Sequence, residues 1–517
     1  MGFTPYFLWS DLLIYGLVLL MGLWLFFALR REYWRVALRQ VSANRVAMIS
    51  FGILCVYGSI ALLDTLHFKR INKDNPQGGN ITSVLDIVLE PLRAGTEKTY
   101  SAPFATRAFA METVQRDGRQ VREFPRLERA GVKLANPDGD ASADIWQRAA
   151  TGLGWGIAIG LLLFAVCWMF NKLRAAQTAS LAGGQFAGNG PLLLAGVPSA
   201  ATTAAEVTDA KSQQPLAMSA LQGAGLGSPA AVSTAAGTVE TLPPVARRHV
   251  RGYWVAGFLA VVALIICEAV ALTREGGYHI LGTDKAGLDV FYTAVKSIRT
   301  GLVIGTLSTL IVTPLGIMFG IMAGYFGGWV DDLIQYVYTT LASIPSILLI
   351  AAAMLIVQAR LTQEETIVTA DKRLVWLCII MGITSWTGLC RLIRGETLKL
   401  REVEYIQAAD AFGVSRWRIM ARHLVPSVMH LVLISVILQF SGLVLTEAVL
   451  AYVGIGVDPS MQSWGNMINQ ARLELARDPV VWWNLLAAFI FMLTLVLPAN
   501  MFGDAVRDAL DPRLRKR

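Results

Sequence analysis

Apolar residues along the chain gather into nine long stretches that are separated by polar segments. A bilayer hydrocarbon core about 30 Å thick is crossed by about 20 helical residues that rise about 1.5 Å each. Since every stretch approaches that length, the pattern predicts an all-α, polytopic integral membrane protein. The predicted spans lie at about residues 11–29, 46–64, 151–169, 252–272, 301–325, 333–357, 374–390, 427–449 and 483–502.

Basic residues between the spans indicate the orientation of the chain, because arginine and lysine are retained on the cytoplasmic side of a membrane. The loop between the first two spans holds Arg30, Arg31, Arg35, Arg39 and Arg45. It is therefore predicted to be cytoplasmic, with the N-terminus outside, residues 65–150 outside and residues 170–251 inside. The basic segment 391–426 and the tail ending in DPRLRKR are cytoplasmic by the same rule.

Two long polar segments interrupt the series of spans. Residues 65–150 carry scattered Pro, Gly and charged residues, and we expect them either to form a small external domain or to wrap over the membrane portion. Residues 175–251 are mostly Ala, Gly, Ser and Thr with few charges, which is typical of a flexible cytoplasmic linker. We accordingly divide the chain into residues 1–174, the linker 175–251 and residues 252–517.

The composition agrees with a membrane protein and offers no enzymatic site. Hydrophobic residues make up 54% and charged residues 16% of the 517, and the mean hydropathy is +0.51, too apolar for an ordinary soluble protein. The basic cytoplasmic loops account for the formal charge of +8. Neither a phosphate-binding loop nor a spaced set of metal ligands nor a Ser/His/Asp arrangement occurs, so we expect no catalytic residue, metal or cofactor in this chain.

One cytoplasmic stretch, YIQAADAFGVSRWRIMARHLVP at residues 405–426, resembles the helix pair of a DNA-binding repressor. Gly413 suits the left-handed conformation that ends a helix, and Ser415 can cap the next helix. DNA reading also needs further helices that hold the second helix in a major groove, and the loop 391–426 has no room for them. Pro426 predicts that a helix stops at the membrane surface and that the next span begins there.

The same stretch resembles the cytoplasmic loop of the inner-membrane permease subunits of bacterial ATP-binding-cassette (ABC) importers. Those permeases carry an EAA motif that is followed by Gly, then by His or Ile, and then by Pro. Here QAADAFG begins at Gln407 and ends at Gly413, and HLVP begins at His423 and ends at Pro426. Gln407 stands where the family usually has Glu, and Glu404, one helical turn earlier, can supply a carboxylate.

Further segments narrow the resemblance to the dipeptide and oligopeptide branch of that family. In family order they are YHILGTDKAGLDV, AGYFGGWVDD, LASIPSILL, LTEAVLAYVGIGVDPSMQSWG and GDAVRDALDPRLRKR, and Leu288 stands where the branch more often has Arg. The resemblance implies a six-span core of the type I importer permeases. Both 46–64 and 252–272 can serve as its first span. We favour 252–272, which makes residues 1–251 an N-terminal extension with about three added spans.

The resemblance implies a permease subunit that forms half of the translocation path of an ATP-driven importer for dipeptides or oligopeptides, in the inner (cytoplasmic) membrane of a bacterium. The implied partners are a homologous second permease, two ABC ATPase subunits and a periplasmic or extracellular solute-binding protein that delivers a short peptide. ATP and Mg are then bound by the ATPase partners, and this chain is a transport subunit rather than an enzyme.

The resemblance also implies that the loop 391–426 couples ATP hydrolysis to transport. The small residues Ala408, Ala409 and Gly413 allow close approach to an ATPase groove, which larger side chains can fill. Such a rigid knob transmits a rigid-body movement to the adjoining spans. The alternative is that these small residues only pack the loop against its own spans. The predicted coupling residues are Glu404, Tyr405, Gln407, Ala408, Ala409, Phe412, Gly413, Arg416, His423 and Pro426.

Two acidic residues and two prolines within the apolar spans are further candidates. Glu268 and Glu447 are predicted to contact substrate, because charge inside a membrane is costly and commonly faces a cavity or a partner. The alternative for both is a place near the headgroups or an internal hydrogen bond. Pro314 and Pro345 predict bends in their spans, although packing alone explains such prolines equally well.

Other functions compete with a peptide permease. Within the family, the cargo could be a nickel complex or a peptide antibiotic. Outside it, the alternatives are an ion-coupled secondary transporter, which works without ATPase partners, and a membrane-tethered DNA-binding regulator. The helix pair together with GDAVRDALDPRLR favours the ABC permease, and nothing in the sequence names the cargo.

Overall fold

The computed structural model describes most of the chain, and its residues are mainly helical, which confirms the predicted fold class. It describes residues 2–30, 32–71, 81–116, 119–132, 134, 137–186, 244–274, 277–360 and 366–510. The chain divides into two units, Met1–Gly160 with Phe258–Arg517, and Leu161–Gly257. Among the described residues, short β-strands of the first unit add to the predicted all-α pattern.

Every predicted span corresponds to a helix or to a pair of helices. In chain order, the nine predicted spans correspond to α1 (Trp9–Arg30), α3 (Arg45–Thr65), α6 (Pro137–Phe186), α7 (Pro244–Thr273), α8 (Val290–Phe326), α9 (Gly328–Ser343) with α10 (Ser346–Arg360), α11 (Thr366–Thr384) with α12 (Thr387–Arg401), α15 (Val425–Tyr452) and α17 (Trp483–Leu510). Among the described residues, six helical segments are long and apolar enough to cross a membrane, and the bent pair of α9 and α10 makes a seventh candidate.

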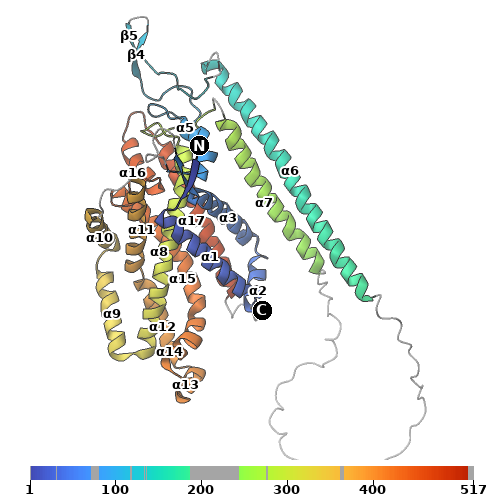
Figure 1. Ribbon diagram of the computed structural model, residues 1–517, viewed down its shortest axis with the longest axis vertical. Helices are drawn as coiled ribbons and strands as arrows, with labels where there is room; N and C mark the ends of the chain where they lie inside the picture. The colour runs from blue at the N-terminus through green and yellow to red at the C-terminus, as the bar shows by residue number, and fades with distance from the viewer. Residues whose placement is uncertain are drawn as a thin grey trace, which may run out of the picture. The chain divides into compact units, whose positions relative to one another are not determined.

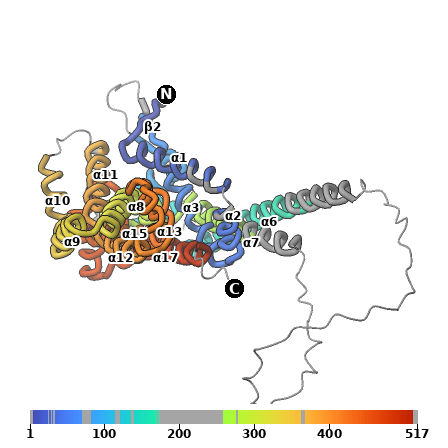
Figure 2. The backbone as a smooth tube through the Cα atoms, turned by 90° about the horizontal axis from the view of Figure 1, so that it is seen from below, coloured from blue at the N-terminus to red at the C-terminus, as the bar shows by residue number. Residues whose placement is uncertain are grey.

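Helix α8 contributes to all three large apolar clusters of the first unit. It begins at Asp289, whose carboxylate accepts a hydrogen bond from the Tyr292 N–H at 3.1 Å, and it ends at Gly327, where φ is +64°. One cluster joins α8 to α3, α17 and α16 (Trp464–Glu474), another to α9, α12 and α15, and a third to α10 and α11. Figure 2 shows α8 surrounded by α11, α12 and α15.

Three glycines on one face of α8 bring α12 close to it. Gly316, Gly320 and Gly324 are spaced four residues apart and therefore share a helical face. A Cβ atom added to Gly316 would lie 2.7 Å from the Leu389 side chain, and one added to Gly320 would lie 2.8 Å from the carbonyl oxygen of Cys390. Because small residues permit such close packing of membrane helices, α8 and α12 form a tightly packed pair.

The predicted span 333–357 is two helices rather than one. Helix α9 ends at Ser343, α10 begins at Ser346, and the two axes meet at 87°. Pro345 lies at this break. Proline interrupts a helix because it has no backbone N–H and clashes with the preceding turn. The bend predicted at Pro345 is therefore confirmed. Pro314, by contrast, lies inside α8, which continues through it.

Helix α3 packs in the bundle of the first unit. Its Tyr57 hydroxyl donates a hydrogen bond to the Phe491 carbonyl of α17 at 3.1 Å, and the rings of Phe51 and Phe502 lie 5.4 Å apart. Helix α7 instead packs along α6, where a Cβ added to Gly156 would lie 2.8 Å from Leu264. This packing favours the stretch 46–64 as the first core span, against the sequence interpretation that preferred 252–272. The domain boundaries at 174 and 251 stay predictions.

The described residues of the segment 81–134 wrap over one end of the bundle, which was one of the two expectations for the segment 65–150 (Figure 1). The Glu97 N–H donates to the Gly287 carbonyl at 2.9 Å, and the Ser101 N–H donates to the Thr283 hydroxyl at 2.6 Å. The local elements are an antiparallel sheet of β1 (Gly2–Tyr6), β2 (His67–Ile71) and β3 (Ile81–Ser83), the short helices α4 (Val84–Val88) and α5 (Glu90–Ala94), and the hairpin of β4 (Glu112–Arg116) and β5 (Arg119–Glu123).

A buried histidine holds this wrapping segment to the bundle. The His279 Nδ1 lies 2.7 Å from the Asp289 carboxylate, and its Nε2 lies 3.6 Å from the carboxylate of Glu97. Burial alone lowers the pKa of His279, but the two carboxylates outweigh it and raise the pKa above its ordinary value. Glu97 also accepts hydrogen bonds from the backbone N–H groups of Glu128 and Arg129, so one carboxylate fixes three parts of the chain.

The described residues of the second unit are the later part of α6 and the first part of α7. Both helices reach into the predicted linker 175–251, because α6 continues to Phe186 and α7 begins at Pro244. The remainder of that linker lies outside the described residues.

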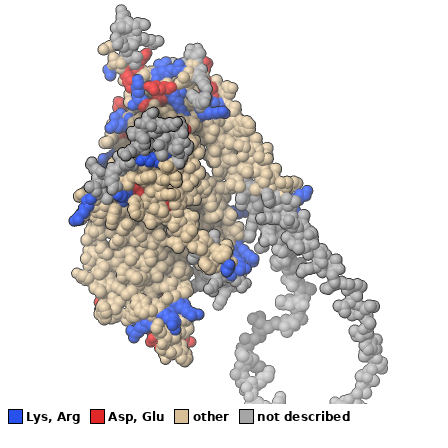
Figure 3. Space-filling model, viewed as in Figure 1, with Lys and Arg blue, Asp and Glu red and all other residues tan. Residues whose placement is uncertain are grey.

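Charged residues gather mainly at two ends of the first unit on the face in Figure 3. One end holds the wrapping segment 81–134, and the other holds the basic loop that follows α12. The surface between them is mostly uncharged, which suits a hydrocarbon layer.

Candidate functional site

The predicted helix pair is present at the basic end of the bundle, between α12 and α15. Helix α13 (Glu404–Ala411) is followed two residues later by Gly413, whose φ is +71°, as predicted from the left-handed preference of glycine. The Gly413 N–H donates to the Asp410 carbonyl at 2.9 Å, and the Val414 N–H donates to the Ala409 carbonyl at 3.1 Å. This paired pattern is the Schellman motif, and it fixes the direction in which the chain leaves α13.

Three buried apolar side chains anchor the helix pair to the bundle. Ile406 of α13, Ile419 of α14 (Arg416–Ile419) and Leu424 are almost completely buried in the cluster formed by α8, α9, α12 and α15. Burial of each such side chain contributes about 1.5 to 3 kcal/mol. The loop is therefore packed against its own spans, and its exposed side projects as a fixed surface.

The connection from α14 to α15 differs from the prediction. Residues Met420–Leu424 form a π-helical segment, η1, in which the Val425 N–H donates to the Met420 carbonyl five residues earlier. Pro426 then lies in the first turn of α15. Helical structure is continuous from Arg416 to Tyr452, so no helix stops at Pro426. The wider π turn changes the hydrogen-bond spacing just before the proline, and a missing N–H is tolerated in a first turn.

The exposed side of the loop is aromatic. The exposed fraction is 87% for Phe412 and 63% for Trp417, and Tyr405 is exposed as well. The Tyr405 ring lies 6.3 Å from that of His423. Large apolar side chains on a cytoplasmic surface indicate a binding surface for another protein. Of these, Trp417 was not predicted, although an aromatic residue between two arginines at a charged membrane face was a usable signal.

The other predicted coupling residues divide between the exposed side and the packed side. Ala409 and His423 are half-buried, and Ala409 packs against the apolar cluster of the loop's own spans. Ser415 precedes α14, as predicted, but its side chain makes no capping hydrogen bond. The predicted residues on the exposed side are Glu404, Tyr405, Gln407, Ala408, Phe412, Gly413, Arg416 and Pro426.

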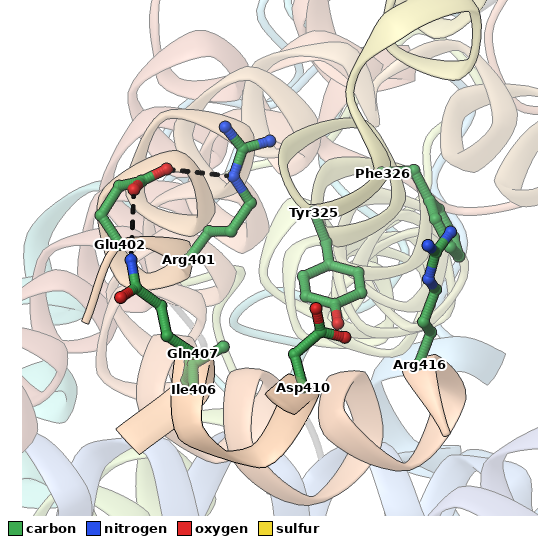
Figure 4. A pocket seen from close by; sticks show the side chains of 8 residues that line it. All are labelled: Tyr325, Phe326, Arg401, Glu402, Ile406, Gln407, Asp410 and Arg416. Atoms are coloured by element: carbon green, nitrogen blue, oxygen red, sulfur yellow. Dashed lines mark hydrogen bonds and ion pairs between the residues drawn. The ribbon is translucent and has the colours of Figure 1, made fainter. Parts of the chain in front are cut away.

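A pocket of about 260 Å³ lies between α13 and the end of α8 (Figure 4). On one side, the Arg401 Nε lies 3.3 Å from Glu402, which also accepts from the Gln407 amide at 3.4 Å. On the other side, Asp410 faces the Tyr325 hydroxyl. In the pocket, Arg401, Glu402 and Asp410 thus each have a neighbour of opposite charge or of polar character. The lining residues are Tyr325, Phe326, Arg401, Glu402, Ile406, Gln407, Asp410 and Arg416.

The two predicted substrate contacts lie away from this loop. Glu447 is buried in α15 against α16, and a Cβ added to Gly465 would lie 2.7 Å from its carboxylate. A Cβ added to Gly152 of α6 would likewise lie 2.6 Å from the carboxylate of Glu268 in α7. Both carboxylates thus lie at interfaces between helices, and their contact with substrate remains a prediction.

Comparison with known proteins identifies the family of this chain. Residues 316–516 match the family described as "Binding-protein-dependent transport system inner membrane component". The chain is 33% identical over 248 residues to the oligopeptide transport system permease protein of Haemophilus influenzae, covering 48% of this chain and 74% of that protein. It is 32% identical over 238 residues to the glutathione transport system permease protein of Pectobacterium atrosepticum, covering 46% and 73%.

A mycobacterial relative extends the match over nearly its whole length. The oligopeptide transport system permease protein of Mycobacterium tuberculosis is 32% identical over 288 residues, covering 52% of this chain and 94% of that protein. The anchored helix pair lies within the residues that match the family, which agrees with the resemblance of its motifs. The chain therefore belongs to the family of binding-protein-dependent transport system inner membrane components, the permease subunits of ABC importers.

Proposed function

We propose that this chain forms half of the path by which an ATP-driven importer moves dipeptides or oligopeptides across the inner membrane of a bacterium. The observation that carries the proposal is the loop α13–Gly413–α14, which is anchored by buried Ile406 and Ile419 and presents exposed Phe412 and Trp417. A rigid aromatic projection on a cytoplasmic face suits an apolar groove on a partner protein.

The proposed partners follow from the family. A homologous second permease completes the path, two ABC ATPase subunits bind ATP and Mg and hydrolyse the ATP, and a periplasmic or extracellular binding protein delivers the peptide. This chain binds no cofactor of its own in the proposal, because its sequence has no phosphate-binding loop.

The proposed cargo follows from the names of the relatives, which are permeases of oligopeptide, dipeptide and glutathione transport systems. All three cargoes contain peptide bonds and carry a carboxylate. These names favour a short peptide over the nickel complex or peptide antibiotic that the motifs left open. Membership of the ABC importer permeases likewise disfavours a secondary transporter.

In the proposed mechanism, closure of the ATPases displaces α13. Because Ile406 and Ile419 are buried among α8, α12 and α15, the displacement moves these helices together as a rigid body. The path then opens alternately to the two sides of the membrane. Ala409 is half-buried against the loop's own spans, whereas Ala408 is exposed and is therefore the better candidate for close contact with the ATPase.

Purification of the membrane complex tests the proposal. Ala408→Trp should reduce the ATPase that co-purifies with this chain by about tenfold, since overpacking an interface costs on the order of 1 to 3 kcal/mol. The matched variant Ala409→Trp should instead lower the thermal stability of the chain without its partners. In proteoliposomes, the complete complex should import labelled dipeptide only with ATP.

Three results would contradict the proposal. They are ATP hydrolysis by the isolated chain, peptide uptake that is driven by an ion gradient without ATP, and wild-type co-purification of ATPase with Ala408→Trp.

A further inference from the structure

A bidentate ion pair joins α12, at the start of the coupling loop 391–426, to α9, the first helix of the bent pair. The Arg394 guanidinium of α12 donates to both carboxylate oxygens of Asp331 in α9, at 2.6 and 2.7 Å. The same group lies 3.3 Å from the Gln335 side-chain oxygen. The side chains of Arg394 and Asp331 are 24% and 15% exposed. Paired hydrogen bonds between a guanidinium and a carboxylate fix orientation as well as distance, so this pair sets the direction of α9 relative to α12.

The backbone between α8 and α9 places little constraint on the direction of α9. Helix α9 follows α8 through Gly327 and Gly328, both with positive φ values, +64° and +53°. Two glycines in this region form a turn that changes conformation with little steric resistance. Only Ile334 and Tyr338 of the described residues of α9 are buried. Side-chain contacts must therefore hold α9 in place.

Helix α12 supplies two of these contacts from one face. Arg391, one turn before Arg394, places its guanidinium 5.4 Å from the centre of the Tyr338 ring, a cation–π contact. Helix α12 is itself packed on the glycines of α8, and after Arg401 it leads directly into α13. Displacement of α13 therefore reaches α9 through arginines of α12.

The face of α9 that points away from the bundle has an unusual composition for a membrane helix. One stripe of this face carries hydroxyl, amide and carboxylate side chains, and the exposed ones are Asp332, Gln335, Tyr336, Thr339, Thr340 and Ser343. The neighbouring stripe is apolar, with Trp329, Leu333 and Val337 exposed. Between Leu486 and Met501, α17 by contrast exposes Leu486, Phe489, Ile490, Leu493, Leu497 and Met501, with Thr494 as the one exposed polar residue. A polar stripe of this kind is costly against lipid tails, which favours a place toward water rather than toward lipid.

We propose that Arg394 and Asp331 are positioning residues. They transmit the displacement of α13 to α9, and the movement of α9 shifts one polar wall of the translocation path. The inference rests on the proposed function as an ATP-driven importer. In this role the two residues act through α9 and not through contact with ATP or substrate. Their effect is on the number of peptides imported for each ATP hydrolysed.

Charge exchange in the assembled complex tests the pair. Arg394→Asp and Asp331→Arg each place like charges together, and each should lower the peptide-to-ATP ratio in proteoliposomes by about tenfold, the scale of a lost close charge pair. The double variant restores opposite charges and should recover most of the ratio. Arg394→Lys keeps the charge but loses the paired geometry, so its ratio should be intermediate.

Matched controls separate positioning from folding. Lys399 lies on the same helix and pairs only locally with Glu396, at 3.1 Å, so Lys399→Gln should keep the wild-type ratio. Co-purification of the ATPase should stay at the wild-type level for Arg394→Lys. A wild-type ratio in Arg394→Lys and in both single reversals would overturn the inference, as would a double variant no better than the singles. Absence of ATP-driven uptake by the wild-type complex would defeat the proposed function instead.

Discussion

Single residues decide the shape of the coupling loop, and Gly413 is the clearest case. An added Cβ atom would meet nothing within 4 Å, yet its φ is +71°. The constraint on this residue is therefore conformational and not steric crowding by neighbours. A substitution at Gly413 therefore tests the direction of the loop without adding a steric clash with a neighbouring residue.

Substitution of Gly413 should redirect α14 without changing the exposed face of α13. Gly413→Val should cost about 1 to 2 kcal/mol, because the left-handed region is unfavourable for residues with a Cβ, and branching at Cβ adds to the cost. Gly413→Asn should cost much less, because asparagine enters this region more readily. Thermal unfolding of the purified chain measures the cost, and peptide uptake measures the loss of coupling. Equal behaviour of both variants would contradict this account.

The predictions for single residues were confirmed where local backbone geometry decides the conformation. They were incomplete where packing against distant spans decides the environment of the side chain. The turn at Gly413 follows from the backbone freedom of glycine, which the sequence displays directly. The half-buried position of Ala409 depends on spans that are distant in sequence. The absent capping bond of Ser415 shows the same limit, since a capping residue type does not ensure that its side chain turns inward.

At the scale of elements, hydropathy located the spans but not their internal breaks. The stretch 333–357 carries no charged residue, so hydropathy alone could not separate α9 from α10; only Pro345 marked the place. The π segment Met420–Leu424 has no sequence signature of its own. The wrapping segment 81–134 was left with two alternatives because its contacts, such as that of Glu97 with Gly287, join positions far apart in sequence.

The wrapping segment should hold less tightly as the pH rises. In the folded protein the pKa of His279 is raised, so its protonated form favours the docked state. This stabilisation is fully present below about pH 6.5, the ordinary histidine value, and is lost as the pH rises through the raised pKa. Asp289 and Glu97 face the imidazole and favour its charge, and Arg129 opposes it. Protection factors for the Glu97 and Phe104 amides, which correct for intrinsic exchange, should therefore fall across this range.

The variant His279→Gln provides the control for that measurement. It should remove the pH dependence of protection at both amides while leaving amides inside α17 unchanged. An unaltered pH dependence in this variant would assign the effect to another group.

At the scale of the whole molecule, the charge of the loops predicts which ends of the helices face the cytoplasm. In a variant without the five native cysteines, Thr113→Cys, exposed on β4, should react with a membrane-impermeant thiol reagent in intact cells. Ala43→Cys, exposed between α2 (Glu32–Val41) and α3, should react only after permeabilisation. The reverse labelling would invert the proposed topology.

The order of the spans along the chain did not reveal which of them build the bundle. Both 46–64 and 252–272 have the length and composition of a first core span, and the second lies next to the matched domain. Contacts of α3 with α17, and of Arg299 in α8 with Asp11 of α1 at 2.7 Å, bring the N-terminal helices into the bundle. Sequence adjacency was a poor guide because α3 and α8 pack together although residues 66–289 separate them along the chain.

The break between α9 and α10 also bears on how the protein is made. Helices of 16 and 15 residues are about 24 and 22 Å long, so neither alone crosses a hydrocarbon core of about 30 Å. The insertion machinery must therefore receive them as one unit, with the exposed backbone at Pro345 shielded from lipid. The arginines that hold α9 belong to α12, which is synthesised later. During biogenesis α9 consequently gains these contacts only after α12 has been synthesised.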